Sequence, residues 1–262
     1  MRHNLSHPRV TLSALKEKSM ILHIPHASTD TLGKPFLCDR ETELSRMTDW
    51  YTDELFDHPK ALRVVFPISR LICDVERFED DALELMSQKG MGVCYTQNAY
   101  GEKLREIHDR EREAIVADYY RPHHQRLEEA VRMELQQKAK ALIVDCHSFP
   151  DGPLPCNIDQ TVPRPDICIG TDAFHTPQKI TDMLVEHFNE CGCSVAINRP
   201  FAGTIVPMKY YQKESRVHSV MIEVNRRLYR GDDNEKSSSF EKVKKHLQRA
   251  LKLLANVDTT TL

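Results

Sequence analysis

The stretch ALIVDCHSFP, residues 141–150, is the clearest buried strand in the chain. Its first residues are apolar, whereas Asp145, His147 and Ser148 lie at its carboxyl end, where the strand meets a loop. An apolar run of this length is typical of a strand that is covered on both faces of a parallel sheet. In open α/β sheets, ligands bind at the carboxyl ends of such strands. The sequence therefore predicts a ligand site beside Asp145 and His147.

Apolar runs and helix-favouring segments alternate on either side of this strand. Further strands are predicted at residues 20–25, in the two runs 62–69 and 70–75, and at 92–96, 166–170, 194–198 and 218–224. Helices are predicted at residues 41–56, at 176–190, at 239–255 and, as two helices separated near Pro122, within 102–140. This alternation predicts an α/β fold with a mixed, mainly parallel sheet that helices flank on both faces. The length of 262 residues fits a single domain, 1–262.

The composition narrows the class of protein. Hydrophobic residues make up 40% of the chain and charged residues 29%, which is ordinary globular usage and excludes a disordered tail. The net charge of −3 provides no basic field, so nucleic acid is not an expected partner. No apolar run approaches the roughly 18 residues of a membrane span. The eight cysteines are scattered without a C-x-x-C pair, which suits reduced thiols in the cytoplasm.

Three polar residues interrupt or end predicted strands and are candidates for chemistry. His26 stands in the segment PHAST, His147 in VDCHS and Glu223 in MIEVN. A buried carboxylate without a partner costs several kcal/mol, so Glu223 needs a partner, a metal or a catalytic task. Zinc accepts imidazole and carboxylate ligands, and a catalytic zinc site usually has three protein ligands and one water. His26, His147 and one acidic residue would complete such a site.

Two aspartates are candidates for the acidic ligand. Asp49 and Asp53 lie one turn apart on the predicted helix 41–56, so both could face the same site, and the choice stays open. Taken singly, each candidate has a simpler interpretation, because a lone histidine is more often a core or surface residue and an aspartate near a helix start is more often a cap. His23 is predicted to pack or to support the site, and His123 and His124 to be solvated helix residues.

Seven segments together resemble a known family. In chain order they are HIPHAST, MTDWYTDELF, SRLICDVERF, GVCYT, YYRPHHQRL, VDCHS and MIEVNRRLY, within residues 23–229. This ordered set is similar to the N-formylglutamate amidohydrolases, the N-formylglutamate deformylases of histidine degradation. The resemblance implies a fold similar to the zinc carboxypeptidases and the aspartoacylase-like deacylases, a phosphorylase/hydrolase-like mixed sheet with a metal at the strand ends.

The resemblance also implies roles for individual residues. His26, Asp49 and His147 match the metal ligands of the family, and Glu223 matches the general base that zinc carboxypeptidases supply from a late strand. The chain departs from the family pattern at Glu76, where members usually have Asn.

Arginines are the expected ligands of a substrate carboxylate, because guanidinium binds carboxylate through two parallel hydrogen bonds. Arg70 and Arg77 resemble the substrate-carboxylate and carbonyl-polarising positions of the family, and Arg199 is a third candidate. Arg77 is the preferred substrate ligand and is predicted to act in catalysis with the general base. Arg226 and Arg227 are interpreted as ordinary surface charges.

The predicted activity is that of a metal-dependent amidohydrolase that cleaves N-formyl-L-glutamate to formate and L-glutamate. One divalent ion, zinc, would bring the pKa of a bound water to about 7, and Glu223 would accept the proton. Two alternatives stay open: a deacylase of another N-acyl amino acid, and a non-catalytic metal- or ligand-binding member of the fold. A metal-independent structural protein is a third and weaker one. Residues 80–90 and 150–165 are interpreted either as lids over the site or as simple loops.

Overall fold

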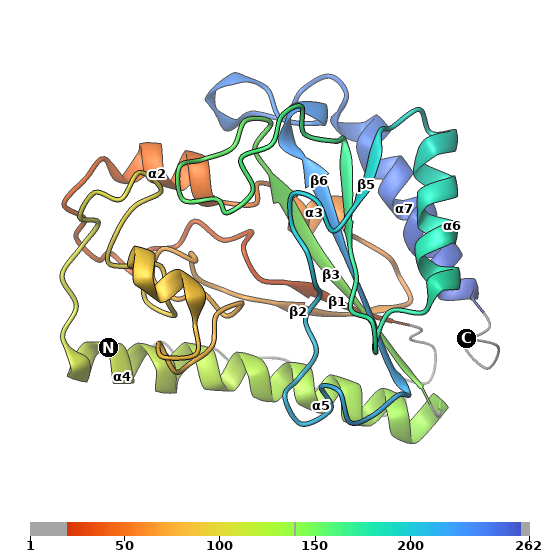
Figure 1. Cartoon of the computed structure of the whole chain (residues 1–262), viewed down its shortest axis with the longest axis horizontal. Coiled ribbons are helices and arrows are strands. Elements are labelled where there is room, and N and C mark those ends of the chain that lie inside the picture. The colour runs from red at the N-terminus through yellow and green to blue at the C-terminus, as the bar shows by residue number, and fades with distance from the viewer. Residues whose placement is uncertain (1–19, 139, 258–262) are drawn as a thin grey trace.

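A six-stranded sheet with the strand order β2-β1-β3-β6-β4-β5 forms the centre of the molecule in a computed structural model that describes residues 20–138 and 140–257 (Figure 1). The strands are β1 (Met20–Ile24), β2 (Ala61–Val65), β3 (Ala141–Phe149), β4 (Ile167–Gly170), β5 (Val195–Ile197) and β6 (Val217–Asn225). Among the described strands, β4 and β6 pair antiparallel and the other neighbours pair parallel. The predicted mixed, mainly parallel sheet is confirmed.

Helices cover both faces of the sheet. They are α2 (Arg40–Met47), α3 (Thr52–Leu55), α4 (Asp109–Ile115), α5 (Arg121–Lys138), α6 (Gln178–Glu190) and α7 (Phe240–Asn256), with short turns η1 (Leu85–Lys89), η2 (Val116–Tyr120), η3 (Arg226–Leu228) and η4 (Asp232–Asn234). None of the helices in the described chain is both long and apolar enough to cross a membrane.

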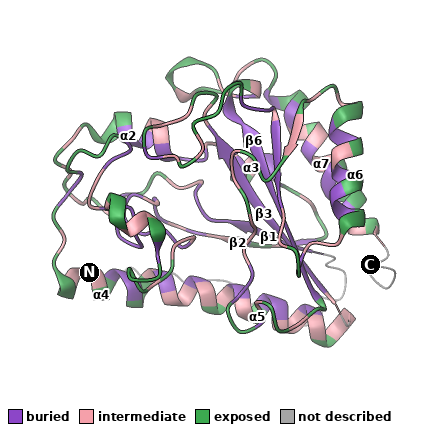
Figure 2. Ribbon diagram, viewed as in Figure 1, coloured by how far each residue is buried: buried purple, intermediate pink, exposed green. Residues whose placement is uncertain are grey.

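The alternation of side chains along β3 divides the core in two. Leu142, Val144 and Cys146 pack with α6, α7 and α3, whereas Ala141 and Ile143 pack with α5 on the other face. All nine residues of β3 and of β6 are buried, as Figure 2 shows for the central strands. The strand that was predicted from its apolar sequence is therefore the middle of the sheet.

The predicted helix 41–56 is wrong as a single helix. It is broken between α2 and α3, where Tyr51 has a left-handed backbone with φ of 61°. The amide of Asp49 donates to the carbonyl of His26 at 3.0 Å instead of continuing the helix. A long-range backbone contact therefore overrides the helical periodicity and places Asp49 at the end of β1.

The strand predictions for residues 70–75 and 92–96 are also wrong. Residues 70–75 form turns in which the amides of Ile72 and Cys73 both donate to the carbonyl of Ser69. The segment 92–96 forms no ladder of its own. Its Val93 packs with Ile72 in a buried cluster beside the sheet. The apolar runs therefore indicate burial, which buried loops share with strands.

The helical region before β3 is continuous and does not form two separate helices. The turn η2 is a π-helix that joins α4 to α5, and Pro122 is the second residue of α5. Proline has no amide hydrogen to give to the preceding turn, and a wider turn accommodates it without ending the helix. The prediction of a break near Pro122 located the irregularity but mistook its form.

Candidate active site

Parallel pairing brings the polar ends of three strands together on one face of the sheet. His147 of β3 lies opposite Glu223 of β6, and Asp145 of β3 lies opposite His23 of β1. Because residues two apart on a strand share a face, all four side chains are on the side that α5 covers. His26 follows the end of β1, so its loop reaches the same edge of the sheet.

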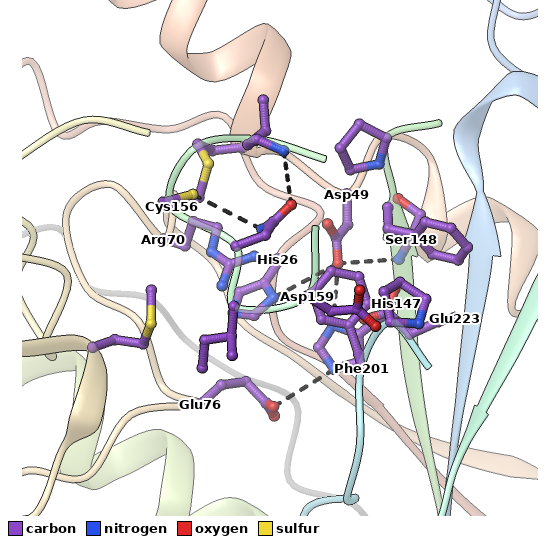
Figure 3. Close-up of a pocket in the computed structure, with 18 of the residues that line it drawn as sticks. His26, Asp49, Arg70, Glu76, His147, Ser148, Cys156, Asp159, Phe201 and Glu223 are labelled. Atoms are coloured by element: carbon purple, nitrogen blue, oxygen red, sulfur yellow. Dashed lines mark hydrogen bonds and ion pairs between the residues drawn. The ribbon is translucent and has the colours of Figure 1, made fainter. Parts of the chain in front are cut away.

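The structure brings His26, Asp49 and His147 together at this edge. One carboxylate oxygen of Asp49, Oδ2, lies 3.1 Å from Nδ1 of His147 and 3.6 Å from Nδ1 of His26. One possible ligand atom from each residue lies within 4.8 Å of the others, and all three side chains are buried. Figure 3 shows the three side chains pointing toward one another. Asp53, the alternative acidic ligand, is exposed and lies outside this group.

The opposite nitrogen of each histidine ring is held by a buried carboxylate. His26 Nε2 lies 2.9 Å from Asp74 Oδ1, and His147 Nε2 lies 3.0 Å from Asp145 Oδ1. Carboxylates in this position fix the ring orientation and the tautomer of metal-binding histidines. The Nδ1 atom of His26 is buried and has no hydrogen-bond partner. Two oriented imidazole nitrogens and one carboxylate oxygen fit a divalent ion of the zinc type.

Arg226 orients the carboxylate of Asp49. Its Nη2 donates to Asp49 Oδ1 at 2.8 Å, while the amide of Ser148 donates to Asp49 Oδ2 at 3.2 Å. Burial opposes ionisation of Asp49, yet the His147 and His26 rings and the Arg226 charge together hold its pKa well below the usual value. Arg226 is 5% exposed, so its interpretation as a surface charge is wrong. Arg227 pairs with Asp166 and is partly exposed.

Asp74 links the two predicted substrate arginines to His26. Arg70 Nη2 lies 2.8 Å from Asp74 Oδ2, and Arg77 Nε lies 3.7 Å from the same oxygen. Burial opposes ionisation of Asp74, but the two arginine charges and His26 hold its pKa well below the usual value. Both arginines line the cavity at this edge, whereas Arg199 is exposed and is not among the lining residues.

Glu223 faces the same cavity without a hydrogen bond to its Oε2 atom. The side chain belongs to a residue that is 6% exposed, and burial, with a contribution from Asp49, raises the pKa of Glu223 to about 8. A carboxylate that ends near a cluster of possible metal ligands and has a raised pKa is typical of a catalytic group.

A sequence profile of the N-formylglutamate amidohydrolase family matches residues 18–230. The chain belongs to the N-formylglutamate amidohydrolase family. Among solved structures it is similar to an N-formylglutamate amidohydrolase from Ralstonia eutropha JMP134, with 21% identity, a TM-score of 0.80 and coverage of 94% of this chain and 95% of the other. A gene product of Agrobacterium tumefaciens matches with 18% identity, a TM-score of 0.63 and coverage of 92% and 93%. No curated protein matches.

These similarities show that the chain shares the fold of the solved amidohydrolase. They agree with the fold class and the family that the sequence predicts. The family relationship identifies the chain as an amidohydrolase.

A second polar group lies behind the candidate ligand His147 of this amidohydrolase. Its members are His23, Asp145 and Glu76, with His23 Nδ1 2.8 Å from Asp145 Oδ1 and 3.4 Å from Glu76 Oε1. The Nε2 atoms of His23 and His123 lie 2.9 Å apart. Asp145 Oδ1 already contacts His147, so we interpret this group as support for that ring. His23 shares Asp145 Oδ1 with His147, and its expected supporting role stays a prediction.

The prediction that His123 and His124 are solvated is wrong. His123 is fully buried, and burial, with the neighbouring His23, lowers its pKa well below the usual value. His124 is partly buried against the ring of Tyr120, and burial lowers its pKa to about 4. His123 lies on the buried face of α5 that covers the sheet, and His124 lies beside that face. The feature of the sequence that could have indicated their burial was their position in an otherwise amphipathic helix.

The cavity of the amidohydrolase has a volume of about 450 Å³. The two segments interpreted as possible lids both contribute to its wall, through Met86 of one and Leu154, Cys156 and Ile158 of the other. Lys89 Nζ donates to the carbonyl of Cys156 at 2.9 Å and joins the two segments. Polar groups therefore form one end of the cavity, and apolar loop residues form part of its wall.

Sequence reasoning placed Asp145 beside the site but gave it no contact there, and it gave no role at the site to Arg226 or Asp74. Arg226, Asp74 and Asp145 contact the three candidate ligands directly. Two local features of the sequence pointed to the aspartates. Asp145 stands two residues before His147, and Asp74 stands four residues after Arg70, with which it could pair. No comparable local signal identified Arg226, because its partner Asp49 lies 177 residues away in the chain.

Proposed function

We propose that this amidohydrolase is a metal-dependent enzyme that hydrolyses the amide bond of N-formyl amino acids, and N-formyl-L-glutamate is the substrate that the family name indicates. One observation carries the proposal. Asp49 Oδ2 lies between the Nδ1 atoms of two oriented histidines, and Glu223 faces the same cavity. Such a set can bind a divalent ion beside a proton acceptor.

His26, Asp49 and His147 are the proposed ligands, and zinc is the proposed ion, although other divalent ions favour similar ligands. When bound, the ion lowers the pKa of a water molecule and polarises the amide carbonyl. Asp74 and Asp145 keep the two imidazoles in the tautomer that presents Nδ1. Arg226 keeps Asp49 Oδ2 turned toward them.

Glu223 is the proposed general base. It accepts the proton of the attacking water and returns it to the nitrogen of the leaving amino acid. The raised pKa of Glu223 favours the first step, because a more basic carboxylate takes the proton of the water more readily. Glu223 must be ionised before the reaction starts so that it can accept this proton. The two steps thus need the same side chain in both protonation states.

Arg77 is the proposed ligand of the substrate α-carboxylate. Its Nε donates to the carbonyl of Met91 at 3.3 Å, which fixes the guanidinium at the wall of the cavity. Arg70 is held by Asp74 and by a hydrogen bond to Tyr95, so it offers a fixed charge that can stabilise negative charge developing on the amide oxygen. Arg199 lies outside the lining and has no part in this proposal.

The test compares formate release by the zinc-loaded wild type, by Glu223→Gln and by Glu128→Gln. Glu128→Gln is the control, because it removes an acidic residue from α5 at a partly exposed ion pair outside the cavity. Glu223→Gln should lower kcat roughly 100- to 10,000-fold, as expected for the loss of a general base. It should bind zinc as the wild type does. Full activity of Glu223→Gln, or no hydrolysis of any N-acyl amino acid by the zinc-loaded wild type, would contradict the proposal.

A further inference from the structure

Glu76 presents a carboxylate to the cavity without receiving a hydrogen bond. It is one of the lining residues, its side chain is 17% exposed, and its Oε1 atom is buried and has no hydrogen-bond partner. The nearest imidazole nitrogens are His23 Nδ1 at 3.4 Å and His147 Nε2 at 3.7 Å. Figure 3 shows Glu76 at the side of His147 away from Asp49.

Asp145 already takes the hydrogens of these two nitrogens. Its Oδ1 lies 2.8 Å from His23 Nδ1 and 3.0 Å from His147 Nε2, both closer than Glu76. Each ring nitrogen carries at most one hydrogen, so neither can donate fully to a second carboxylate. A largely buried acceptor without a donor costs free energy. The buried Oε1 atom lies on the side of His23, and the exposed part of the Glu76 side chain faces the cavity, where a donor group of a ligand can reach it.

Most of the cationic charge at the cavity is already paired. Asp74 holds Arg70 at 2.8 Å, and Asp49 holds Arg226 at 2.8 Å. Arg77 has a longer contact with Asp74, at 3.7 Å. Of these three arginines it is therefore the one most available to bind a ligand carboxylate.

Arg46 is the fourth arginine that lines the cavity in the described chain. It lies 3.5 Å from a carboxylate oxygen of Glu43, and its guanidinium stands over the ring of Tyr100 at 4.4 Å. The charge balance thus favours a ligand with one carboxylate. A second carboxylate in the same cavity would also meet the negative charge of Glu76, which lines it.

We propose that Glu76 determines substrate specificity by accepting a hydrogen bond from an uncharged donor on the substrate side chain, so that the preferred substrates are N-formyl amino acids with a side-chain carboxamide. Arg77 binds the α-carboxylate of such a substrate. The inference rests on the proposed function and narrows its substrate class.

N-formyl-L-glutamine and N-formyl-L-glutamate are a matched pair for testing this role. They have the same shape, but the carboxamide carries two N–H donors, whereas the carboxylate carries none and has the same charge as Glu76. The wild type, loaded with zinc in mildly alkaline buffer, should have a kcat/KM roughly 10- to 100-fold higher for the glutamine compound, the range expected for a hydrogen bond to a charged group.

Glu76→Gln tests whether Glu76 is the cause of this preference. Its side chain is uncharged and can both donate and accept, so the ratio of the two kcat/KM values should move toward one or reverse. Glu128→Gln on α5 makes the same chemical change outside the cavity and should keep the wild-type ratio. A wild-type preference for the glutamate compound overturns the inference, even if Glu76→Gln fails to fold. So does an unchanged ratio in a folded, zinc-binding Glu76→Gln protein.

Calorimetry separates this inference from the proposed function. Binding of both compounds is measured on zinc-loaded Glu223→Gln, in which turnover is blocked. Tighter binding of the glutamine compound supports the role of Glu76, even if the wild type hydrolyses neither compound and the proposed function fails. Equal affinities, tighter binding of the glutamate compound or no binding of either compound overturns the inference, whatever the wild type hydrolyses.

Discussion

Asp49 has a different set of contacts on each carboxylate oxygen. Arg226 holds Oδ1, while the amide of Ser148 and Nδ1 of His147 approach Oδ2. This division leaves Oδ2 facing the two histidines and prevents the carboxylate from turning away. Asp53, four residues further along the chain, is exposed, because the break at Tyr51 changes the direction of the backbone.

Asp49→Asn should weaken zinc binding by more than about 100-fold, because loss of supporting contacts alone costs roughly 10- to 100-fold and a direct ligand costs more. Asp53→Asn is the matched control and should bind zinc as the wild type does, since its side chain is exposed. A competition titration against a coloured chelator measures both affinities. Equal losses in the two variants would mean that Asp49 is not the acidic ligand.

At the scale of single residues, the sequence identified side chains that end strands. His26, His147 and Glu223 were found because a polar residue at the end of an apolar run is unusual and detectable within a few positions. Arg226 was misassigned because its burial depends on Asp49, which only the folded chain brings near. Long-range ion pairs leave no local pattern.

At the scale of elements, regular strands and helices followed their sequence patterns, whereas irregular segments did not. β3 and β6 are apolar along most of their length, and α6 and α7 lie within a few residues of the predicted ranges. The break between α2 and α3 was missed because a contact from Asp49 to the loop after β1 sets it. Residues 70–75 were mistaken for a strand because a buried loop has the same apolar composition.

The helix α7 offers two leucines for a test of this packing. Leu251 is fully buried against the sheet, whereas Leu253 is 39% exposed on the same helix. Leu251→Ala should lower the free energy of unfolding by about 2–5 kcal/mol, because it removes buried methyl groups and leaves a cavity. Leu253→Ala should change it by about 0.5 kcal/mol or less. Urea unfolding of both variants measures the difference, and similar losses would argue against the packing of α7 described here.

At the scale of the whole molecule, a single sheet lies between two hydrophobic clusters, one on each of its faces. Residues of β1 and β3 pack in both of the clusters that cover the sheet, through alternate side chains. If the packing of one cluster were lost, it would therefore expose β1 and β3, which also carry residues of the other cluster. We propose on this ground that residues 1–262 form a single domain.

A single domain should unfold in one cooperative step. The only tryptophan, Trp50, lies at the break between α2 and α3, so its fluorescence reports on the site, whereas far-ultraviolet circular dichroism reports on all helices. The two signals should give the same midpoint in urea, as two-state unfolding requires. Clearly separated midpoints would mean that part of the chain unfolds independently of the site.

His218 should make the stability of the whole molecule depend on pH. It is buried in β6, and neither ring nitrogen has a hydrogen-bond partner. Burial, with the charges of Lys140 and His175, lowers its pKa to about 4. An unfolded histidine has a pKa of about 6.5. The unfolded chain therefore binds the proton more tightly, and the stabilising effect of neutral His218 is complete above about pH 6.5 and is lost as the pH falls through about 4.

The expected loss from His218 is roughly 2 kcal/mol between neutral pH and about pH 5. His218→Gln cannot take up this proton, so its free energy of unfolding should fall by about that much less over the same interval. Urea unfolding at both pH values in the presence of a chelator measures the difference without a contribution from bound metal. His108→Gln, at the exposed start of α4, removes an imidazole from the surface and is the control. If the pH dependence of His218→Gln equals that of the wild type, His218 is not buried as a neutral group, and the packing of β6 around it would need to be redrawn.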